Sequence, residues 1–471
     1  MKYKYVVIGA GAAGLVVAIG LAKAKKKVIL IENNQFGGDC TNFGCIPSKA
    51  LIASSKIANN LKRAHEFGLD FHIDYFDANK SLQRVRDIIE NVRSKEDAPA
   101  LEKIGIDTLK AKASFKTDKI IEAIDDKNQK HTIVGKKIII ATGTSPFIPP
   151  ISGLENIPFD TNETIFNLKE IPPSLCIIGA GAIGSELGQA FQRLGSQVTI
   201  IDVAPRLLVN ESFETSKVMI DTFIKEGLKI HLNSTVQNVT YSNDTFDVFI
   251  KNNKSGYINQ IKSQKLLLAT GRVIAIKDLK LENADIQYSK KGILVDHFAR
   301  TNKKHIFAIG DCIGAPFFTH KAESMARSVL FSLLVPFVKK KICLHPMPRV
   351  TFTDPEIASI GLSEEKAIEQ YGEKKVAIYF VPLEDLDRAI VENETQGFVK
   401  IITHKWSSEI IGTTIVSKRA GEMLSEILVA MKKNIKLRSL SDIIHPYPTY
   451  SLGIRKAADK YLTQTIFKRR M

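Results

Sequence analysis

The chain has 471 residues and a formal net charge of +16, with 44% apolar and 25% charged residues. This length supports several domains with complete cores, and the composition is that of a globular protein. The basic residues are spread along the chain, with short clusters at Lys25–Lys27, Lys339–Lys341 and Lys468–Arg470. No nucleic-acid-binding motif surrounds them, so we expect a solvated basic surface and no nucleic-acid partner.

Two apolar stretches raise the question of a membrane span. Tyr5–Ala22 carries no charge, but glycines interrupt it. Met325–Val338 is short, contains Arg327 and is interrupted by Pro336. We therefore expect no membrane span.

Cysteine usage indicates a reducing compartment. The five cysteines are Cys40, Cys45, Cys176, Cys312 and Cys343. One close pair and three scattered thiols do not make a secreted disulfide framework, and they fit a pair that cycles between two redox states. We expect a cytoplasmic protein with three buried, inert thiols beside that pair.

The N-terminal stretch predicts a dinucleotide-binding βαβ unit. A strand is expected at Lys4–Ile8, a helix through about Ala24 and a second strand at Lys27–Ile31, which ends on Glu32. The turn between the first strand and the helix carries Gly9, Gly11 and Gly14. Such glycines let the backbone approach a pyrophosphate at a helix N-terminus, and the acid binds a ribose.

The stretch Gly37–Lys49, GGDCTNFGCIPSK, predicts a reactive thiol pair. Five positions of regular helix would hold Cys40 and Cys45 too far apart for a disulfide, and Gly44 can supply the required break. A helix is expected to begin near Pro47. The helix N-terminus and Lys49 both favour a thiolate. Two buried thiols or half a metal site are the alternatives, but we find no partner ligands at metal-site spacing and predict no metal.

The βαβ pattern then occurs a second time. The strands expected at Leu175–Ile178 and Val198–Ile201 flank a glycine turn and end on Asp202, and each element is shifted by 170 residues from the first unit. The repeated glycines are Gly179, Gly181 and Gly184. Two units in one chain indicate two different nucleotides, most simply a flavin and a nicotinamide that exchange a hydride.

Further strands complete the predicted domains. Ile138–Gly143 and Leu266–Gly271 both run into Ala-Thr-Gly, as strands that close the two nucleotide domains would. Another buried strand ends on Asp311, which is placed to contact a polar cofactor chain. After residue 345, alternating patterns predict antiparallel strands at Arg349–Phe352, Lys375–Val381 and Phe398–Thr403. Helices are expected at Ser363–Tyr371 and Ala420–Lys433.

Together these motifs resemble the class I pyridine nucleotide-disulfide oxidoreductases, the family of dihydrolipoamide dehydrogenase, glutathione reductase and mercuric reductase. The resemblance implies an α/β fold with two Rossmann-like dinucleotide-binding domains, for FAD and NAD, and a C-terminal α+β dimerisation domain. The implied domains are residues 1–149 (FAD-binding, first part), 150–271 (NAD(P)-binding), 272–344 (FAD-binding, second part) and 345–471 (dimerisation).

The resemblance also implies roles for particular residues. Cys45 is expected to be the thiolate in charge-transfer contact with the flavin, and Cys40 the interchange thiol nearer the substrate. Lys49 and Glu186 resemble the family's ion pair beside the flavin. The residues expected to bind the cofactors are Gly9, Gly11, Gly14, Glu32, Gly38, Thr142, Gly143, Gly179, Gly181, Gly184, Asp202, Gly271, Arg272, Asp311, Thr319 and Ala322.

The C-terminal region departs from the family pattern. The resemblance implies a homodimer in which the tail of one subunit completes the active site of the other. Disulfide-reducing members carry a catalytic His followed by Glu five residues later, whereas these positions hold Tyr447 and Leu452, and His445 lies two residues earlier. Mercuric reductases have a Tyr near this point that can face the metal, but they end with a cysteine pair, and this chain has no cysteine after Cys343.

The sequence therefore predicts an FAD-dependent NAD(P)H oxidoreductase with a redox-active disulfide. A carboxylate at Asp202 favours NADH over NADPH, because it binds a free ribose hydroxyl and repels a 2′-phosphate. Electrons are expected to pass through Cys40 and Cys45 to a disulfide, a metal ion or another small acceptor. The alternatives are a dihydrolipoyl dehydrogenase that uses His445 as its base, and a redox-sensing flavoprotein.

Overall fold

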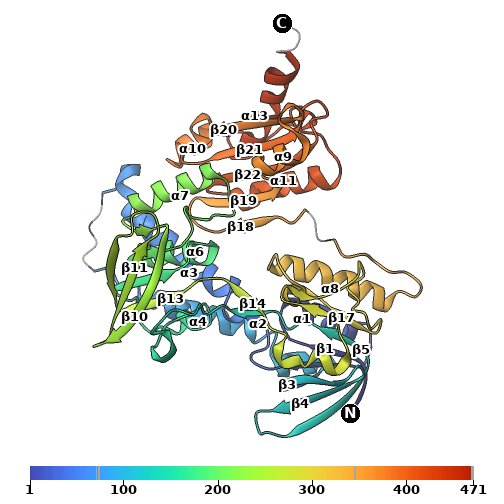
Figure 1. The fold of residues 1–471 in the computed structure, drawn as a ribbon. Helices are drawn as coiled ribbons and strands as arrows, with labels where there is room; N and C mark the ends of the chain where they lie inside the picture. The colour runs from blue at the N-terminus through green and yellow to red at the C-terminus, as the bar shows by residue number, and fades with distance from the viewer. Residues whose placement is uncertain (71, 73–74, 344–345, 468–471) are drawn as a thin grey trace.

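Three main β-sheets, of six, four and five strands, organise the described part of the chain, and smaller sheets join them. The computed structural model describes residues 1–70, 72, 75–343 and 346–467. Figure 1 shows the first sheet near the N-terminus, the second beside it, and the third next to the C-terminus. The element bounds follow the sequence patterns closely, so the three sheets can be taken in turn.

The first sheet is assembled from two distant parts of the chain. Its strands are β1 (Lys2–Ile8), β2 (Val28–Glu32), β3 (Asp107–Thr117), β4 (Ile120–Asp125), β5 (Lys130–Ile140) and β17 (Ile306–Ala308). β1 lies between β2 and β5, and β17 pairs with the far side of β5; all of these contacts are parallel. The parallel core is rich in Val, Ile and Leu because both faces are buried.

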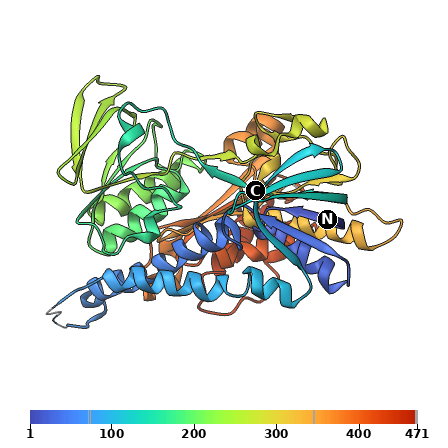
Figure 2. The same ribbon diagram turned by 90° about the horizontal axis from the view of Figure 1, so that it is seen from below.

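The helices of this part of the chain either cover the first sheet or extend to the second region, whose core they share. They are α1 (Ala12–Lys23), α2 (Gly38–Asn42), α3 (Cys45–Lys62), α4 (Asn79–Arg93), α5 (Ala98–Lys103) and α8 (Thr319–Leu334). α1 packs against α8, and α3 packs against α4 and against α6 of the second region. The blue pair in Figure 2 shows α3 and α4 side by side.

The second sheet belongs to the segment between β5 and β17. Its parallel order is β13-β7-β8-β9. The strands are β7 (Ser174–Ile178), β8 (Gln197–Ile201), β9 (Lys229–His231) and β13 (Lys265–Leu268). Its helices are α6 (Ala182–Arg193) and α7 (Phe213–Lys225), and an antiparallel sheet adds β10 (Ser234–Ser242), β11 (Thr245–Asn252) and β12 (Ile258–Ser263). A small ladder of β6 (Thr144–Pro146) and β14 (Arg272–Ile274) joins this region to the first.

The third sheet is antiparallel in the order β18-β19-β22-β21-β20. Its strands are β18 (Arg349–Thr351), β19 (Glu356–Gly361), β20 (Val376–Pro382), β21 (Phe398–His404) and β22 (Ile410–Ser417). The helices around it are α9 (Glu364–Tyr371), α10 (Asp387–Val391), α11 (Ala420–Lys432), α12 (Leu437–Leu440) and α13 (Leu452–Tyr461). A separate hydrophobic core, including Tyr379 and Tyr461, holds this C-terminal region together.

The strands expected beside the two glycine turns and in the C-terminal region occur within two residues of their predicted ends. The helix expected near Pro47 begins at Cys45, which places Pro47 in its first turn as predicted. The predicted domain boundary at residues 344 and 345 and the Lys468–Arg470 cluster lie outside the described residues. Among the described helices, none is both long enough and apolar enough to cross a bilayer.

Candidate active site

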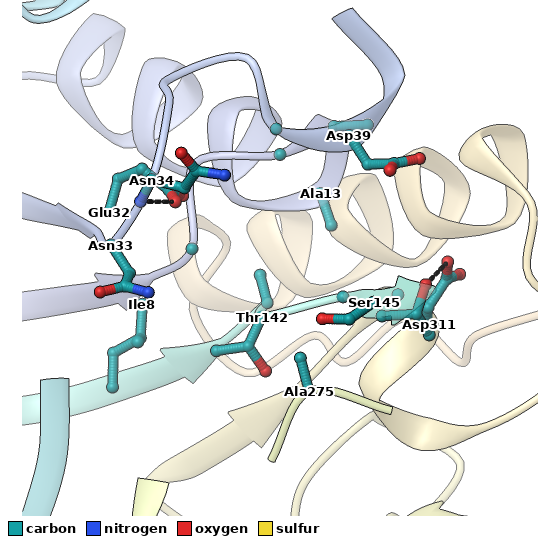
Figure 3. A pocket seen from close by; sticks show the side chains of 18 of the residues that line it. Ile8, Ala13, Glu32, Asn33, Asn34, Asp39, Thr142, Ser145, Ala275 and Asp311 are labelled. Atoms are coloured by element: carbon teal, nitrogen blue, oxygen red, sulfur yellow. Dashed lines mark hydrogen bonds between the residues drawn. The ribbon is translucent and has the colours of Figure 1, made fainter. Parts of the chain in front are cut away.

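A cavity of about 530 Å³ lies where the first sheet ends. The Gly-rich turn after β1, the end of β2, the start of α2, the ends of β5 and β17 and the start of α8 form its walls. Figure 3 shows Glu32 on one side of this cavity and Asp39 and Asp311 on the other. The predicted cofactor residues that line it are Gly9, Gly11, Glu32, Gly38, Thr142, Gly143, Asp311, Thr319 and Ala322.

The glycine turn of the first unit is shaped by close backbone contacts. A β-carbon on Gly14 would lie 1.9 Å from the carbonyl oxygen of Gly9, which itself has φ of +101°. The Glu32 carboxylate accepts hydrogen bonds from the backbone N–H of Ala10, at 2.6 Å, and of Asn34, at 2.8 Å. Burial raises the pKa of Glu32. Gly14 is therefore a packing residue, whereas Glu32 faces the cavity.

The cavity wall carries two buried polar atoms whose hydrogen-bonding capacity is unsatisfied in the described part of the chain. Within the described part of the chain, Asp311 Oδ1 and Thr142 Oγ1 have no hydrogen-bond partner. Burial also raises the pKa of Asp311. Buried polar atoms are nearly always paired, so these two indicate a polar ligand. A cavity lined by the Glu32 carboxylate on one side and by these atoms on the other fits FAD, which supplies hydride-transfer chemistry when bound.

The redox loop reaches the cavity through a break between two helices. α2 ends at Asn42, and α3 begins at Cys45 after Phe43 and Gly44. A β-carbon on Gly44 would lie 2.9 Å from Asp39 Oδ2, so the close approach of α2 and α3 requires glycine there. Cys40 lines the cavity, and Cys45 is the first residue of α3. The break thus brings the two thiols together.

The two thiols have opposite acidities. Both are free and partly buried. A hydrogen bond from the Cys40 thiol, assisted by Thr319 and by the charge of Lys49, lowers the pKa of Cys45 to about 6. Thr319 Oγ1 lies 3.4 Å from Cys45 Sγ. The pKa of Cys40 is raised, first by its bond to Cys45 and then by burial. At neutral pH, Cys45 is the thiolate and Cys40 holds the proton.

An ion pair connects the redox helix to the second nucleotide unit. Lys49 Nζ lies 2.7 Å from Glu186 Oε2, and the Glu186 side chain is 7% exposed. The other Glu186 oxygen accepts from the backbone N–H of Phe352 at 2.8 Å. Lys49 Nζ also lies 4.6 Å from the centre of the Phe352 ring. The pair therefore joins α3, α6 and the start of the C-terminal region.

The second unit copies the first but lies outside the cavity. Asp202 accepts hydrogen bonds from the backbone N–H of Ala180, at 2.5 Å, and of Ala204, at 2.7 Å, as Glu32 does from Ala10. A β-carbon on Gly184 would lie 1.9 Å from the Gly179 oxygen, whereas one on Gly181 would meet open space. None of the predicted second-unit residues lines the cavity.

Arg272 has a contact that the sequence did not reveal. Its side chain donates to Thr144 Oγ1, at 2.7 Å, and to Asp39 Oδ1, at 2.9 Å. Asn162 also donates to Asp39 Oδ1 at 3.1 Å. Arg272 and Gly271 lie on the linking strand and its turn rather than on the cavity wall. The sequence offered two hints of this ion pair: Asp39 stands next to Cys40, and Arg272 directly follows an Ala-Thr-Gly turn.

His445 and Tyr447 are not brought to the thiols within one subunit, since no described residue after Ala322 lines the cavity. His445 Nε2 lies 3.0 Å from Glu426 Oε1, and Nδ1 lies 3.0 Å from the Ile443 carbonyl oxygen. The His445 side chain is 5% exposed. Tyr447 is 72% exposed, and a hydrogen bond to Asp387 raises its pKa. No spacing rule pointed to Glu426.

Two copies of a dinucleotide-binding unit, together with a thiol pair in which one thiol has a lowered pKa, define a flavin- and nicotinamide-dependent thiol oxidoreductase. The chain belongs to the pyridine nucleotide-disulphide oxidoreductases: residues 3–326 match that family, and residues 347–458 match its dimerisation domain. The family assignment expected from the sequence is confirmed. The family is FAD-dependent and uses a pyridine nucleotide, and its dimerisation domain makes the chain a homodimer.

Two relatives and one solved structure resemble this chain over nearly its whole length. A mercuric reductase from Staphylococcus aureus is 31% identical, over 97% of this chain and 82% of the relative. A dihydrolipoyl dehydrogenase from Chlamydia trachomatis is 31% identical, over 94% of this chain and 93% of the relative. The Cu(II) complex of the HOCl-induced flavoprotein disulfide reductase RclA from Escherichia coli has a TM-score of 0.85 and 28% identity, covering 98% of this chain and 99% of that chain.

Proposed function

We propose that this enzyme uses NADH to reduce a metal ion that binds thiolates, such as Hg(II) or Cu(II). FAD and the pair Cys40 and Cys45 carry the electrons. The observation that supports a metal rather than a disulfide is the state of His445. Both of its ring nitrogens face oxygen acceptors in its own subunit, and Leu452 occupies the position of the family's catalytic glutamate. A disulfide acceptor needs a proton donor for its leaving thiolate, whereas a metal ion does not.

The thiol pair fits such a substrate. Soft and borderline metal ions prefer thiolate ligands. Cys45 is a thiolate at neutral pH, and Cys40 lines the cavity, where a metal ion can displace its proton. The electrons balance: one NADH and one Hg(II) give NAD⁺, H⁺ and Hg(0), and one NADH reduces two Cu(II) to Cu(I). The mercuric reductase and RclA relatives support this acceptor class.

The proposal extends to the nucleotide and to the dimer. Asp202 favours NADH, since a carboxylate at the end of this strand repels a 2′-phosphate. Arg206, the nearest arginine along the chain, is tethered to the Val209 carbonyl oxygen at 2.9 Å. We also propose the four domains 1–149, 150–271, 272–344 and 345–471, a cytoplasmic location, and an active site that the second subunit completes near Tyr447.

A dihydrolipoyl dehydrogenase is the second candidate, because the 3.0 Å contact between His445 and Glu426 is itself a histidine–carboxylate pair. In that case the pair would replace the family's own and serve the partner subunit. The relative from Chlamydia trachomatis supports it. A redox sensor is the remaining alternative.

Anaerobic NADH oxidation with a panel of acceptors tests these proposals. We expect turnover with Hg(II) or Cu(II), little with lipoamide or glutathione disulfide, and loss of metal turnover in Cys40→Ser and Cys45→Ser. Strong lipoamide turnover that His445→Ala abolishes would assign the second candidate. If none of the acceptors supports turnover above the oxygen background, the redox sensor is the function that remains. A higher kcat/KM for NADPH than for NADH would reject the NADH assignment.

A further inference from the structure

Helices α1 and α8 run side by side in the same direction. Near their starts, Gly310 lies between Ala13 and Ala322, and farther along, Gly20 lies against Leu330. Both helices begin at the cofactor cavity, because Ala12, Ala13, Thr319 and Ala322 line it. Both therefore end on the opposite side of the FAD-binding region, where Figure 1 shows the loop that follows α8.

Two lysine clusters that are far apart in the sequence follow the ends of these two helices and so lie on the same side of the FAD-binding region. Lys25–Lys27 follow the last turn of α1, and Lys339–Lys341 follow α8. Residues 12–31 and 324–343 contain no Asp or Glu. Two acids of the adjoining elements are already paired, Asp296 with Arg300 and Glu323 with Arg327. We call Lys23, Lys25–Lys27 and Lys339–Lys341 the basic end.

The loop of the basic end folds back on α8 and presents an apolar tip. The backbone N–H of Lys340 donates to Ser332 Oγ at 2.9 Å, and that of Ile342 to the His297 carbonyl oxygen at 2.9 Å. Phe337 is the tip: it is fully exposed, with φ of +64°, and Val338 and Phe331 beside it are 47% and 41% exposed. The loop is thus anchored at its base while its apolar side chains stand in water.

We propose that the basic end docks on the anionic surface of a phospholipid membrane, with Phe337 inserted among the headgroups. Lysines around an apolar or aromatic tip are the signature of peripheral membrane binding, since the charges attract acidic lipids and the apolar groups leave water. A nucleic acid would also pair with the lysines and could stack a base on Phe337, but the tip also exposes the aliphatic Val338, which gains from a lipid interface and not from base stacking. The absence of nucleic-acid motifs from the sequence agrees with the lipid.

Vesicle co-sedimentation of the FAD-loaded dimer tests this docking. We expect binding to vesicles that mix phosphatidylglycerol with phosphatidylcholine, none to pure phosphatidylcholine, and weakening as salt is added. Replacing Lys339, Lys340 and Lys341 by Glu is expected to weaken the apparent affinity roughly a hundredfold. In Phe337→Trp, vesicles are expected to shift the added tryptophan emission to shorter wavelength.

Matched variants separate docking from the general positive charge. Lys229, Lys251 and Lys254 are exposed lysines of the second region, and their replacement by Glu makes the same charge change elsewhere. That triple variant is expected to keep most of the vesicle binding, and both triple variants to keep the FAD content and NADH oxidation of the wild type. Equal weakening by both, no binding to acidic vesicles, or an unshifted Trp emission would overturn the proposal. So would tighter binding to a DNA duplex that Phe337→Ser leaves unchanged.

Discussion

At the scale of single residues, the chemistry depends on an unequal pair of thiols. Cys45 owes its low pKa first to the Cys40 thiol, then to Thr319 and Lys49. The sequence pointed to Lys49 and to the helix start. The resemblance placed Thr319 at the cofactor, but the sequence could not reveal its contact with Cys45, because α8 follows the whole second region in the chain.

The reactivity of Cys45 should therefore follow pH with a midpoint near its pKa of about 6. The thiolate is the form that alkylates, so in the reduced protein the rate of Cys45 modification by iodoacetamide falls as the pH drops through 6. Cys40→Ala should raise this midpoint most, Thr319→Val and Lys49→Ala less, each slowing alkylation at pH 6 roughly threefold or more. Peptide mass spectrometry after timed quenching gives the rates.

Lys56→Ala is the matched control for Lys49→Ala. Lys56 lies on the same helix but pairs with Glu356, at 3.3 Å. The Lys56→Ala variant should therefore leave the pH midpoint of Cys45 alkylation unchanged. A wild-type midpoint near the ordinary thiol value would contradict the assignment of Cys45 as the thiolate.

The proposed preference for NADH rests on one residue, Asp202. Replacing Asp202 by Ala should lower kcat/KM for NADH roughly tenfold or more, because a ribose hydroxyl loses its acceptor, and should narrow the preference over NADPH. Steady-state kinetics with both nucleotides measures the change. Arg206→Ala is the control, and it should leave kcat/KM for NADH unchanged. If the wild type used NADPH better than NADH, and Arg206→Ala lowered only the NADPH activity, the enzyme would be assigned to NADPH instead.

At the scale of elements, each βαβ unit was predictable because its strands are mostly apolar, the first strand runs into a glycine turn and the second leads to an acid, Glu32 or Asp202. The break between α2 and α3 followed from Gly44. The pairings that β3 and β5 make could not be predicted from the sequence. One part of each strand pairs with a parallel neighbour, and the other part pairs with β4 in the antiparallel direction. The ion pair of Arg272 with Asp39 was equally hidden, because no local pattern fixes which loop faces the linker.

Gly181 and Gly184, two of the three glycines of the second turn, are expected to have different roles. Gly184→Ala places a β-carbon against the Gly179 oxygen and should destabilise the protein by about 1–3 kcal/mol. Gly181→Ala meets open space and should leave the fold intact, yet weaken NADH binding where the backbone approaches the pyrophosphate. Urea unfolding and NADH titration distinguish the two. Equal effects on stability would be inconsistent with this division.

At the scale of the whole molecule, the C-terminal region exposes apolar surface that a monomer would not keep in water. Its exposed apolar and aromatic side chains include Ile390, Val391, Val429, Ile443, Ile444 and Tyr447. Ile444 is 96% exposed. The dimer accounts for such a surface, and no sequence pattern could locate it beyond the family resemblance.

We expect the 96% exposed Ile444 to be covered by the partner subunit, so Ile444→Asp should dissociate the dimer by placing an unpaired carboxylate in the contact. Analytical ultracentrifugation should show a monomer, acceptor turnover should fall more than about tenfold, and the Cys45 alkylation midpoint should stay unchanged because its partners belong to the same subunit. Ile258→Asp, at a 62% exposed position of β12, should remain dimeric. A monomeric variant with full turnover would show that each subunit works alone.

The pairing of β17 with β5 also has a consequence for synthesis. During synthesis β5 emerges first, and the entire second region follows it. Only then do β17 and the start of α8 emerge, which complete the wall of the cofactor cavity. A nascent chain therefore has no complete flavin pocket until Ala322 has left the ribosome. By then the glycine turn of the second unit has already emerged. The protein must hold an open, partly assembled first sheet throughout that interval, and flavin can be captured only after it ends.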